Sequence, residues 1–205
     1  KKPDIQKKEM VRIPFFRLDR RLKIFLLVSF IFSLANSSDA FLLLHAKNLG
    51  LTTTLVVLAY VLYNVFQTVF ATPLGVLSDK IGAATVYSFG LLMFSLLYFF
   101  FGFVREPVYL WVLFPLYGLY IAATDGVSKS YISDFISKKE SGTYFGAYYT
   151  LTAIGTFLAS LIGGILWSRI APSATFYYGS ALSFAAFLVY VLSVPRFRIH
   201  RTLPS

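Results

Sequence analysis

Two carboxylate side chains lie deep inside apolar stretches of the sequence, where ionisable groups are uncommon. Asp39 lies in the apolar run 24–44 and Asp125 in the run 108–132. A charge inside hydrocarbon needs a partner, a proton or a water-filled cavity, and such residues mark substrate or ion paths. Lys129 follows Asp125 by four positions, so the two would share a helix face and could pair. Asp39, Asp125 and Lys129 are therefore candidates for proton coupling or gating.

A structural role for the same residues is an alternative. Lys129 could extend its ammonium group to the membrane surface while Asp125 caps or pairs locally. Asp39 has no charged residue within four positions, so a fixed buried polar partner elsewhere in the fold could hold it. The sequence leaves both alternatives open.

Polar side chains recur at helical spacing in the same apolar runs. Tyr60, Asn64 and Gln67 follow one another at i, i+4 and i+7, which places them along one stripe of a helix. A polar stripe on a spanning helix faces a wet cavity or another helix rather than lipid. The candidate cavity residues are Asn36, Tyr60, Asn64, Gln67, Tyr117, Thr124 and Ser128. Plain hydrogen bonding between helices is the alternative reading.

The composition is that of a membrane protein. Of the 205 residues 57% are hydrophobic and only 14% are charged, and the mean hydropathy is +0.69. A spanning helix needs about 20 apolar residues. Six runs fit, at 24–44, 53–74, 83–103, 108–132, 143–166 and 174–194. We expect an all-α membrane protein with a basic segment 1–23, a six-helix bundle over 24–194 and a tail over 195–205.

The basic residues predict the orientation of these spans. Most of the 19 Lys and Arg lie before the first span, in alternate loops and in the tail, and only Lys47, Arg105 and Arg169 fall in the other loops. Cytoplasmic segments carry the excess of Lys and Arg, so both termini are expected in the cytoplasm. The lipid bilayer thereby accounts for the net charge of +10, and no nucleic-acid partner is expected.

The chain matches itself when it is shifted by 89 residues. This shift places Gly75 over Gly164, Ile81 over Ile170 and Gly90 over Gly179. The pattern predicts two copies of a three-helix unit. Because three is odd, the second copy must cross the membrane in the opposite direction, which is an inverted repeat.

Small residues line one face of the fifth apolar run. Gly155, Ala159 and Gly163 are spaced by four, and such a stripe lets helix backbones approach closely. We interpret it first as a packing face.

Residues for enzyme chemistry are sparse. The chain has no Cys, and its two His residues, His45 and His200, are expected in a loop and in the tail, which argues against a metal site. Intramembrane aspartyl proteases carry a Gly-x-Gly-Asp motif, whereas Ala-Ala-Thr precedes Asp125. We expect no enzyme, no metal and no cofactor.

The stretch "GVLSDKIG" resembles the signature between the second and third helices of each half in the major facilitator superfamily. The matching residues are Gly75, Leu77, Asp79, Lys80 and Gly82. The segment 138–149 is similar to the start of the next-to-last helix of that family, and 32–50 resembles the seventh helix of efflux-like or unassigned bacterial members. The chain departs from the family at Ala83 and Ala84, where basic residues usually follow, and at Ser141, where Arg is frequent.

This resemblance covers only the C-terminal six-helix half of a twelve-helix carrier. It implies a half of a secondary transporter that moves a small solute by alternating access, commonly driven by a proton gradient, in the bacterial inner membrane. The partner would be an N-terminal half from the same or a separate chain, or a second copy of this chain. It also implies that Asp79 acts in a cytoplasmic latch. A non-transporting scaffold or a channel subunit is the alternative function.

Overall fold

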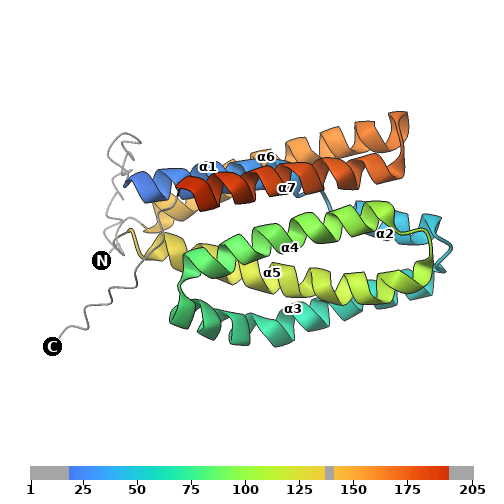
Figure 1. The fold of residues 1–205 in the computed structure, drawn as a ribbon, viewed down its shortest axis with the longest axis horizontal. Helices are drawn as coiled ribbons and strands as arrows, with labels where there is room; N and C mark the ends of the chain where they lie inside the picture. The colour runs from blue at the N-terminus through green and yellow to red at the C-terminus, as the bar shows by residue number, and fades with distance from the viewer. Residues whose placement is uncertain (1–18, 137–140, 194–205) are drawn as a thin grey trace, which may run out of the picture.

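The protein is a bundle of long helices. A computed structural model describes residues 19–136 and 141–193, and every regular element in these ranges is helical. The elements are α1 (Arg20–Ala35), α2 (Ala40–Asn48), α3 (Thr53–Ile81), α4 (Ala83–Phe103), the short 3₁₀ helix η2 (Pro107–Tyr109), α5 (Leu110–Ser133), α6 (Ser141–Arg169) and α7 (Pro172–Ser193). They lie side by side along one common direction (Figure 1). The predicted basic segment and tail fall largely outside the described residues.

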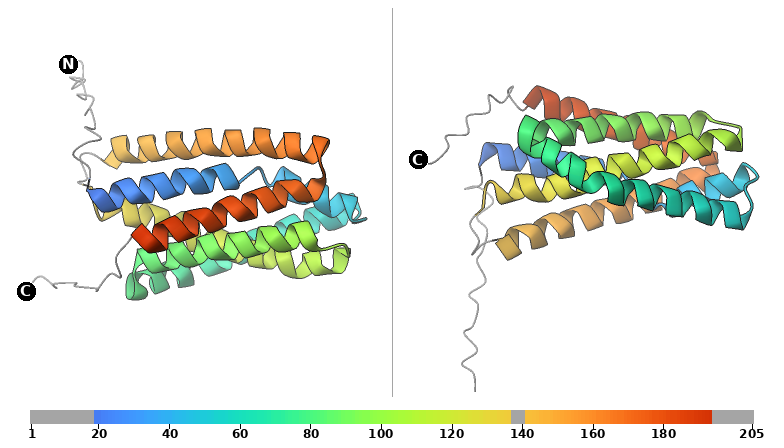
Figure 2. Two further views of the ribbon diagram at one scale, coloured as in Figure 1. Left: turned by 45° about the horizontal axis from the view of Figure 1, so that its top comes forward. Right: turned by 90° about the horizontal axis from the view of Figure 1, so that it is seen from below.

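The six predicted spans are confirmed. By length and apolar composition the helices form six candidate membrane spans, with α1 and α2 together making the first. The start of α1, the α3–α4 junction and the end of α7 lie at one end of the bundle (Figure 2). This is the end at which the sequence predicts cytoplasmic loops.

The sequence predicts one continuous first span over 24–44, but the structure divides this span into two helices. α1 ends at Ala35, residues 36–39 are not helical, and α2 begins at Ala40. The reason is local, because Asn, Ser and Asp side chains offer the backbone hydrogen bonds that compete with a helix. The Oγ of Ser38 accepts from the backbone N–H of Ala40 at 3.3 Å. The break therefore falls at the polar residues between two apolar halves.

The signature "GVLSDKIG" is helical rather than a loop. α3 continues to Ile81 and α4 starts at Ala83, so Gly82 alone separates them. Gly82 has φ +93°, a conformation that side chains disfavour, and its N–H closes α3 on the carbonyl of Ser78. The polar side chains of this signature suit an exposed helix end. Within the described residues, neither Asp79 nor Lys80 forms an ion pair, and both are exposed.

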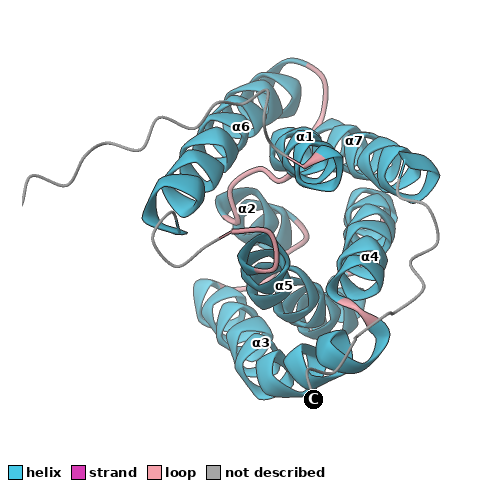
Figure 3. Cartoon of the chain, turned by 90° about the vertical axis from the view of Figure 1, so that its left-hand side faces the viewer, coloured by secondary structure: helices cyan, strands magenta, loops and turns pink. Residues whose placement is uncertain are grey.

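The helices pack in pairs that relate the two halves of the chain. α5 packs against α3 and α4, while α1 packs against α6 and α7, and α4 packs against α7. The end-on view shows α6, α1, α7, α4, α5 and α3 following one another around the bundle (Figure 3). Exchanging the first three spans for the last three preserves this set of pairs.

Glycines lie where these helices cross most closely. A Cβ on Gly118 of α5 would overlap the carbonyl of Tyr63 in α3, and one on Gly155 of α6 would overlap Ser33 in α1. Gly155, Ala159 and Gly163, which form the expected packing stripe, are the buried residues of α6. Small residues therefore set the distance between these backbones.

Candidate functional site

The break in the first span holds a carboxylate between two other helices. The hydroxyl of Tyr117 in α5 donates to Oδ1 of Asp39 at 2.7 Å, and the hydroxyl of Tyr63 in α3 donates to Oδ2 at 2.7 Å. Both bonds are short, and hydroxyl donors form their stronger hydrogen bonds with carboxylate acceptors. Asp39 therefore joins the α1–α2 break to α3 and α5.

These partners are tyrosines rather than cations. Lys129 pairs with Asp125, and no Lys or Arg in the described part of the chain forms an ion pair with Asp39. The sequence has no charged residue within four positions of Asp39, and Tyr63 is not among the residues that helical spacing predicts for the cavity. Tyr63 adjoins the stripe of Tyr60, Asn64 and Gln67, yet it is the residue there that the fold buries, at 4% exposure.

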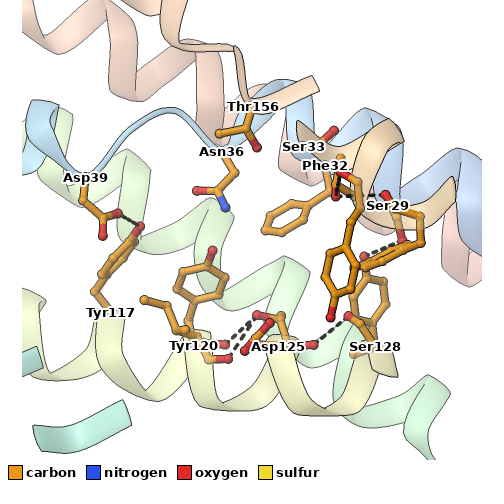
Figure 4. A pocket seen from close by; sticks show the side chains of 16 residues that line it. Ser29, Phe32, Ser33, Asn36, Asp39, Tyr117, Tyr120, Asp125, Ser128 and Thr156 are labelled. Carbon is orange, nitrogen blue, oxygen red and sulfur yellow. Dashed lines mark hydrogen bonds between the residues drawn. The ribbon is translucent and has the colours of Figure 1, made fainter. Parts of the chain in front are cut away.

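A cavity of about 320 Å³ lies between α1, α5 and α6, with Asp39 at one side. Six predicted site residues line it: Asn36, Asp39, Tyr117, Thr124, Asp125 and Ser128. In Figure 4 the side chains of Asn36, Phe32 and Tyr120 point into the space between the α1–α2 segment and α5. The structure therefore brings both intramembrane carboxylates to one cavity.

Other predicted residues lie outside the lining. Tyr60 is 39% exposed on α3, and the amide nitrogen of Asn64 donates to the carbonyl of Tyr60 at 2.7 Å. Gln67 lies where α3 crosses Gly118, with its backbone nitrogen facing that glycine. The α3 stripe thus lies outside the lining of this cavity, and its neighbour Tyr63 is the residue of α3 that contacts Asp39.

Asp125 and Lys129 form the ion pair that their spacing predicts. The Nζ of Lys129 lies 3.2 Å from Oδ2 of Asp125. The side chain of Lys129 is 44% exposed and that of Asp125 is 61% exposed, so the pair is open to the surroundings rather than buried in the core. Asp125 borders the cavity and Lys129 extends beyond it.

Several lining residues were not selected from the sequence. α1 contributes Ser29, Phe32 and Ser33, α4 contributes Tyr87, and α5 adds Tyr120 and Ile121. α6 contributes Tyr148, Tyr149, Thr152 and Thr156. The spacing of four between Tyr148, Thr152 and Thr156 is a signal that could have found the α6 wall. The residues of α4 and α1 meet only in the fold, where the hydroxyls of Ser29 and Tyr87 are 3.1 Å apart.

The sequence predicts His45 in a loop, but the structure places it in α2. It is buried at 4% exposure, and its ring is 4.9 Å from that of Phe176 and 6.3 Å from that of Trp167. Apolar residues on both sides explain why the helix includes it. In the described part of the chain, no three His, Cys, Asp or Glu residues are grouped to hold a metal ion.

The signature residues Asp79 and Lys80 are remote from this cavity. They lie in the last turn of α3, at the end of the bundle where α4 begins, and neither belongs to the lining. The first residues of the segment 138–149, which is similar to the start of the family's next-to-last helix, lie outside the described residues. The cavity and the signature are thus two separate features of the molecule.

Comparison with known proteins places this bundle in a family. Residues 24–205 match the profile of the Major Facilitator Superfamily. An uncharacterized MFS-type transporter of Methanocaldococcus jannaschii is 36% identical over 178 residues, which cover 84% of this chain and 44% of that protein. The class B tetracycline resistance protein of Escherichia coli is 31% identical over 130 residues, covering 62% of this chain and 31% of that protein. The chain thus spans less than half the length of these relatives, and it belongs to the Major Facilitator Superfamily.

Proposed function

We propose that this chain forms a six-helix half of a secondary transporter that moves a small solute by alternating access. The observation that carries the proposal is the cavity beside α1, α5 and α6, in which the carboxylate of Asp39 has no cationic partner among the described residues. Family membership, and relatives whose names describe transporters, support transport rather than catalysis. A scaffold would explain the six spans but not a carboxylate held in a cavity, and a channel would differ from a carrier in its rate of flux.

We infer that the six spans are two inverted three-helix repeats. α3 and α6 each have 29 residues and run in opposite directions along the bundle. A Cβ on Gly90 of α4 would meet Thr124 of α5, and one on Gly179 of α7 would meet the carbonyl of Ala35 in α1. Gly90 and Gly179, which the 89-residue shift aligns, therefore sit at corresponding crossings. Such repeats place the transport site at their interface.

The partner of this bundle is an N-terminal six-helix half, from the same or a separate polypeptide. Relatives more than twice the matched length support it, as does the apolar surface of α3 and α6. The spanning windows of these two helices are only 17% buried, whereas that of α4 is 56% buried. A homodimer of this chain would need both copies to share one orientation.

In this proposal the bundle lies in a bacterial inner membrane with both termini in the cytoplasm. The sequence has its excess of Lys and Arg in the segments expected on the same side of the membrane as the α3–α4 junction, which supports that orientation. Asp79 and Lys80 then act as a cytoplasmic latch, in which exposed charges at a helix end bind the partner half in one state of the cycle.

Asp39 is the proposed coupling residue. A carboxylate in hydrocarbon is stabilised by a proton or by a cation, so its occupancy can alternate with the conformation of the bundle. Its two tyrosine donors come from different helices, which lets a change at Asp39 alter how α3 and α5 pack against the α1–α2 break. The Asp125–Lys129 pair at the other side of the cavity is a gating candidate.

Flux measurements on the complete reconstituted carrier test this function. We expect Asp39→Asn to reduce proton-driven solute flux by more than tenfold, whereas Glu106→Gln, which removes an exposed carboxylate near η2, should leave flux unchanged. Unchanged flux with Asp39→Asn would remove Asp39 from the coupling mechanism. Flux that ignores the gradient, or that reaches channel rates, would contradict the carrier itself.

A further inference from the structure

The cavity wall holds the carboxyl group of Asp39, and no Lys or Arg among the described residues pairs with it. Its described lining contains two carboxylates, Asp39 and Asp125, and no Lys or Arg. Asp125 has the neighbouring ammonium of Lys129, but both oxygens of Asp39 are met only by neutral tyrosine hydroxyls. Hydrogen bonds from neutral donors stabilise a carboxylate without cancelling its charge. The wall therefore favours a positively charged occupant.

Aromatic rings form much of the same wall. The lining includes Phe32, Tyr87, Tyr117, Tyr120, Tyr148 and Tyr149, contributed by α1, α4, α5 and α6. The face of an aromatic ring attracts cations, and this attraction is larger where water is excluded. Rings also offer apolar contact area to a hydrophobic occupant. Charge and aromatic surface thus point to the same kind of ligand.

Five hydroxyl donors of the wall are already engaged within the protein. Ser33 donates to the carbonyl of Phe30 at 2.7 Å, Ser128 to that of Thr124 at 2.6 Å, and Thr152 to that of Tyr148 at 3.0 Å.

Two further hydroxyls are engaged in the same way. That of Thr124 donates to Tyr120, and that of Tyr117 donates to Asp39. These five hydroxyls are therefore not free to donate to an anion or a sugar, whereas their oxygens can still face a cation.

We propose that this cavity binds a lipophilic organic cation, with Asp39 as its counter-charge and the rings of Phe32, Tyr120 and Tyr148 as its apolar contacts. The inference rests on the proposed function, since it names the substrate class of that site. The cavity volume of about 320 Å³ suits an organic molecule. A small metal cation fits less well, because the described residues group no three carboxylate or His ligands.

Equilibrium binding to the purified carrier that contains this chain tests the proposal. Tetraphenylphosphonium and tetraphenylborate have nearly the same size and apolar surface but opposite charge, and each is titrated alone. We expect tetraphenylphosphonium to bind more tightly by about tenfold or more. We expect Asp39→Asn to reduce its affinity by about tenfold and Asp39→Glu to retain most of it. Equal binding of the two ions, or preference for the borate, would overturn the proposal.

Two controls keep this result interpretable. Glu106→Gln removes an exposed carboxylate outside the cavity, so it should leave tetraphenylphosphonium affinity unchanged. A melting curve for each variant separates a loss of binding from a loss of folding. If Asp39→Asn does not fold, the affinity of Asp39→Glu and the comparison of the two ions on the unmodified carrier still test the proposal. Charge-selective binding without gradient-driven flux would sustain this inference and contradict the proposed function. Gradient-driven flux with no preference for the cation would support the proposed function and contradict this inference.

Discussion

Asp39 is the residue on which the candidate site depends. Its position after Asn36, Ser37 and Ser38 breaks the helix, and its carboxylate accepts hydrogen bonds from Tyr63 and Tyr117 at 2.7 Å each. Hydrogen bonds to a charged group contribute more than neutral ones, although those measured between membrane helices average below 1 kcal/mol. The two tyrosines therefore hold the break in place as well as stabilising the charge.

Removing either donor tests this arrangement. We expect Tyr117→Phe and Tyr63→Phe each to lower the free energy of unfolding by about 1 kcal/mol, because each leaves one oxygen of Asp39 without a donor. Thermal unfolding in detergent, arranged as a double-mutant cycle with Asp39→Asn, measures the coupling. Tyr109→Phe, at a tyrosine that is 57% exposed, is the matched control. Additive effects in the cycle would show that the bonds do not stabilise the fold.

At the scale of elements, close helix crossings position the site. Tyr63 and Tyr117 can both reach Asp39 because α3 and α5 touch at Gly118, where a Cβ would overlap the carbonyl of Tyr63. α6 meets α1 in the same way at Gly155 and so closes the cavity wall. These crossings leave no room for a side chain at either glycine. Because the interior is closely packed, a larger residue there would push the helices apart.

Two glycines of α5 give a matched test of this packing. Gly118→Ala should destabilise the protein by about 1–3 kcal/mol, because the new methyl group forces the backbones of α3 and α5 apart. Gly126→Ala should be neutral or stabilising, because no atom lies within 4 Å of its Cβ position and Ala favours a helix. Melting temperatures in detergent compare the two. A Gly126 variant as unstable as the Gly118 variant would contradict the role of this crossing.

The whole molecule is a six-span bundle in which the first and the last described helix begin and end, respectively, at the same end of the bundle. The start of α1, the α3–α4 junction and the end of α7 lie together, and the junctions near Lys47 and Arg105 lie at the opposite end (Figure 2). In the sequence most Lys and Arg fall next to the segments of the first side, and the positive-inside bias predicts that this side is cytoplasmic. The predicted orientation therefore rests on charge.

The absence of native cysteines allows a direct test of orientation. Lys47 and Lys80 are exposed and lie at opposite ends of the bundle. A membrane-impermeant maleimide applied to intact cells should label Lys47→Cys but not Lys80→Cys, and permeabilised cells should label both. Labelling of Lys80→Cys alone in intact cells would show the reverse orientation.

Much of the fold was predictable from the sequence because hydrocarbon imposes one simple rule. A chain that crosses a bilayer must satisfy its backbone internally over about 20 residues, so apolar runs reveal the spans directly. The Asp125–Lys129 pair was predictable for a similar reason, since i, i+4 spacing is a property of a single helix. The spacing of Gly155, Ala159 and Gly163 likewise indicated a packing face.

Features that join different helices were beyond the reach of spacing. The sequence placed Asp39 in an apolar run, but only the tertiary structure decided that Tyr63 and Tyr117 donate to it and that the run breaks there. It also decided that Tyr63, rather than Tyr60, turns inward from α3. The physical reason is that periodicity fixes which residues share a face of one helix, whereas the crossing of helices fixes what that face meets.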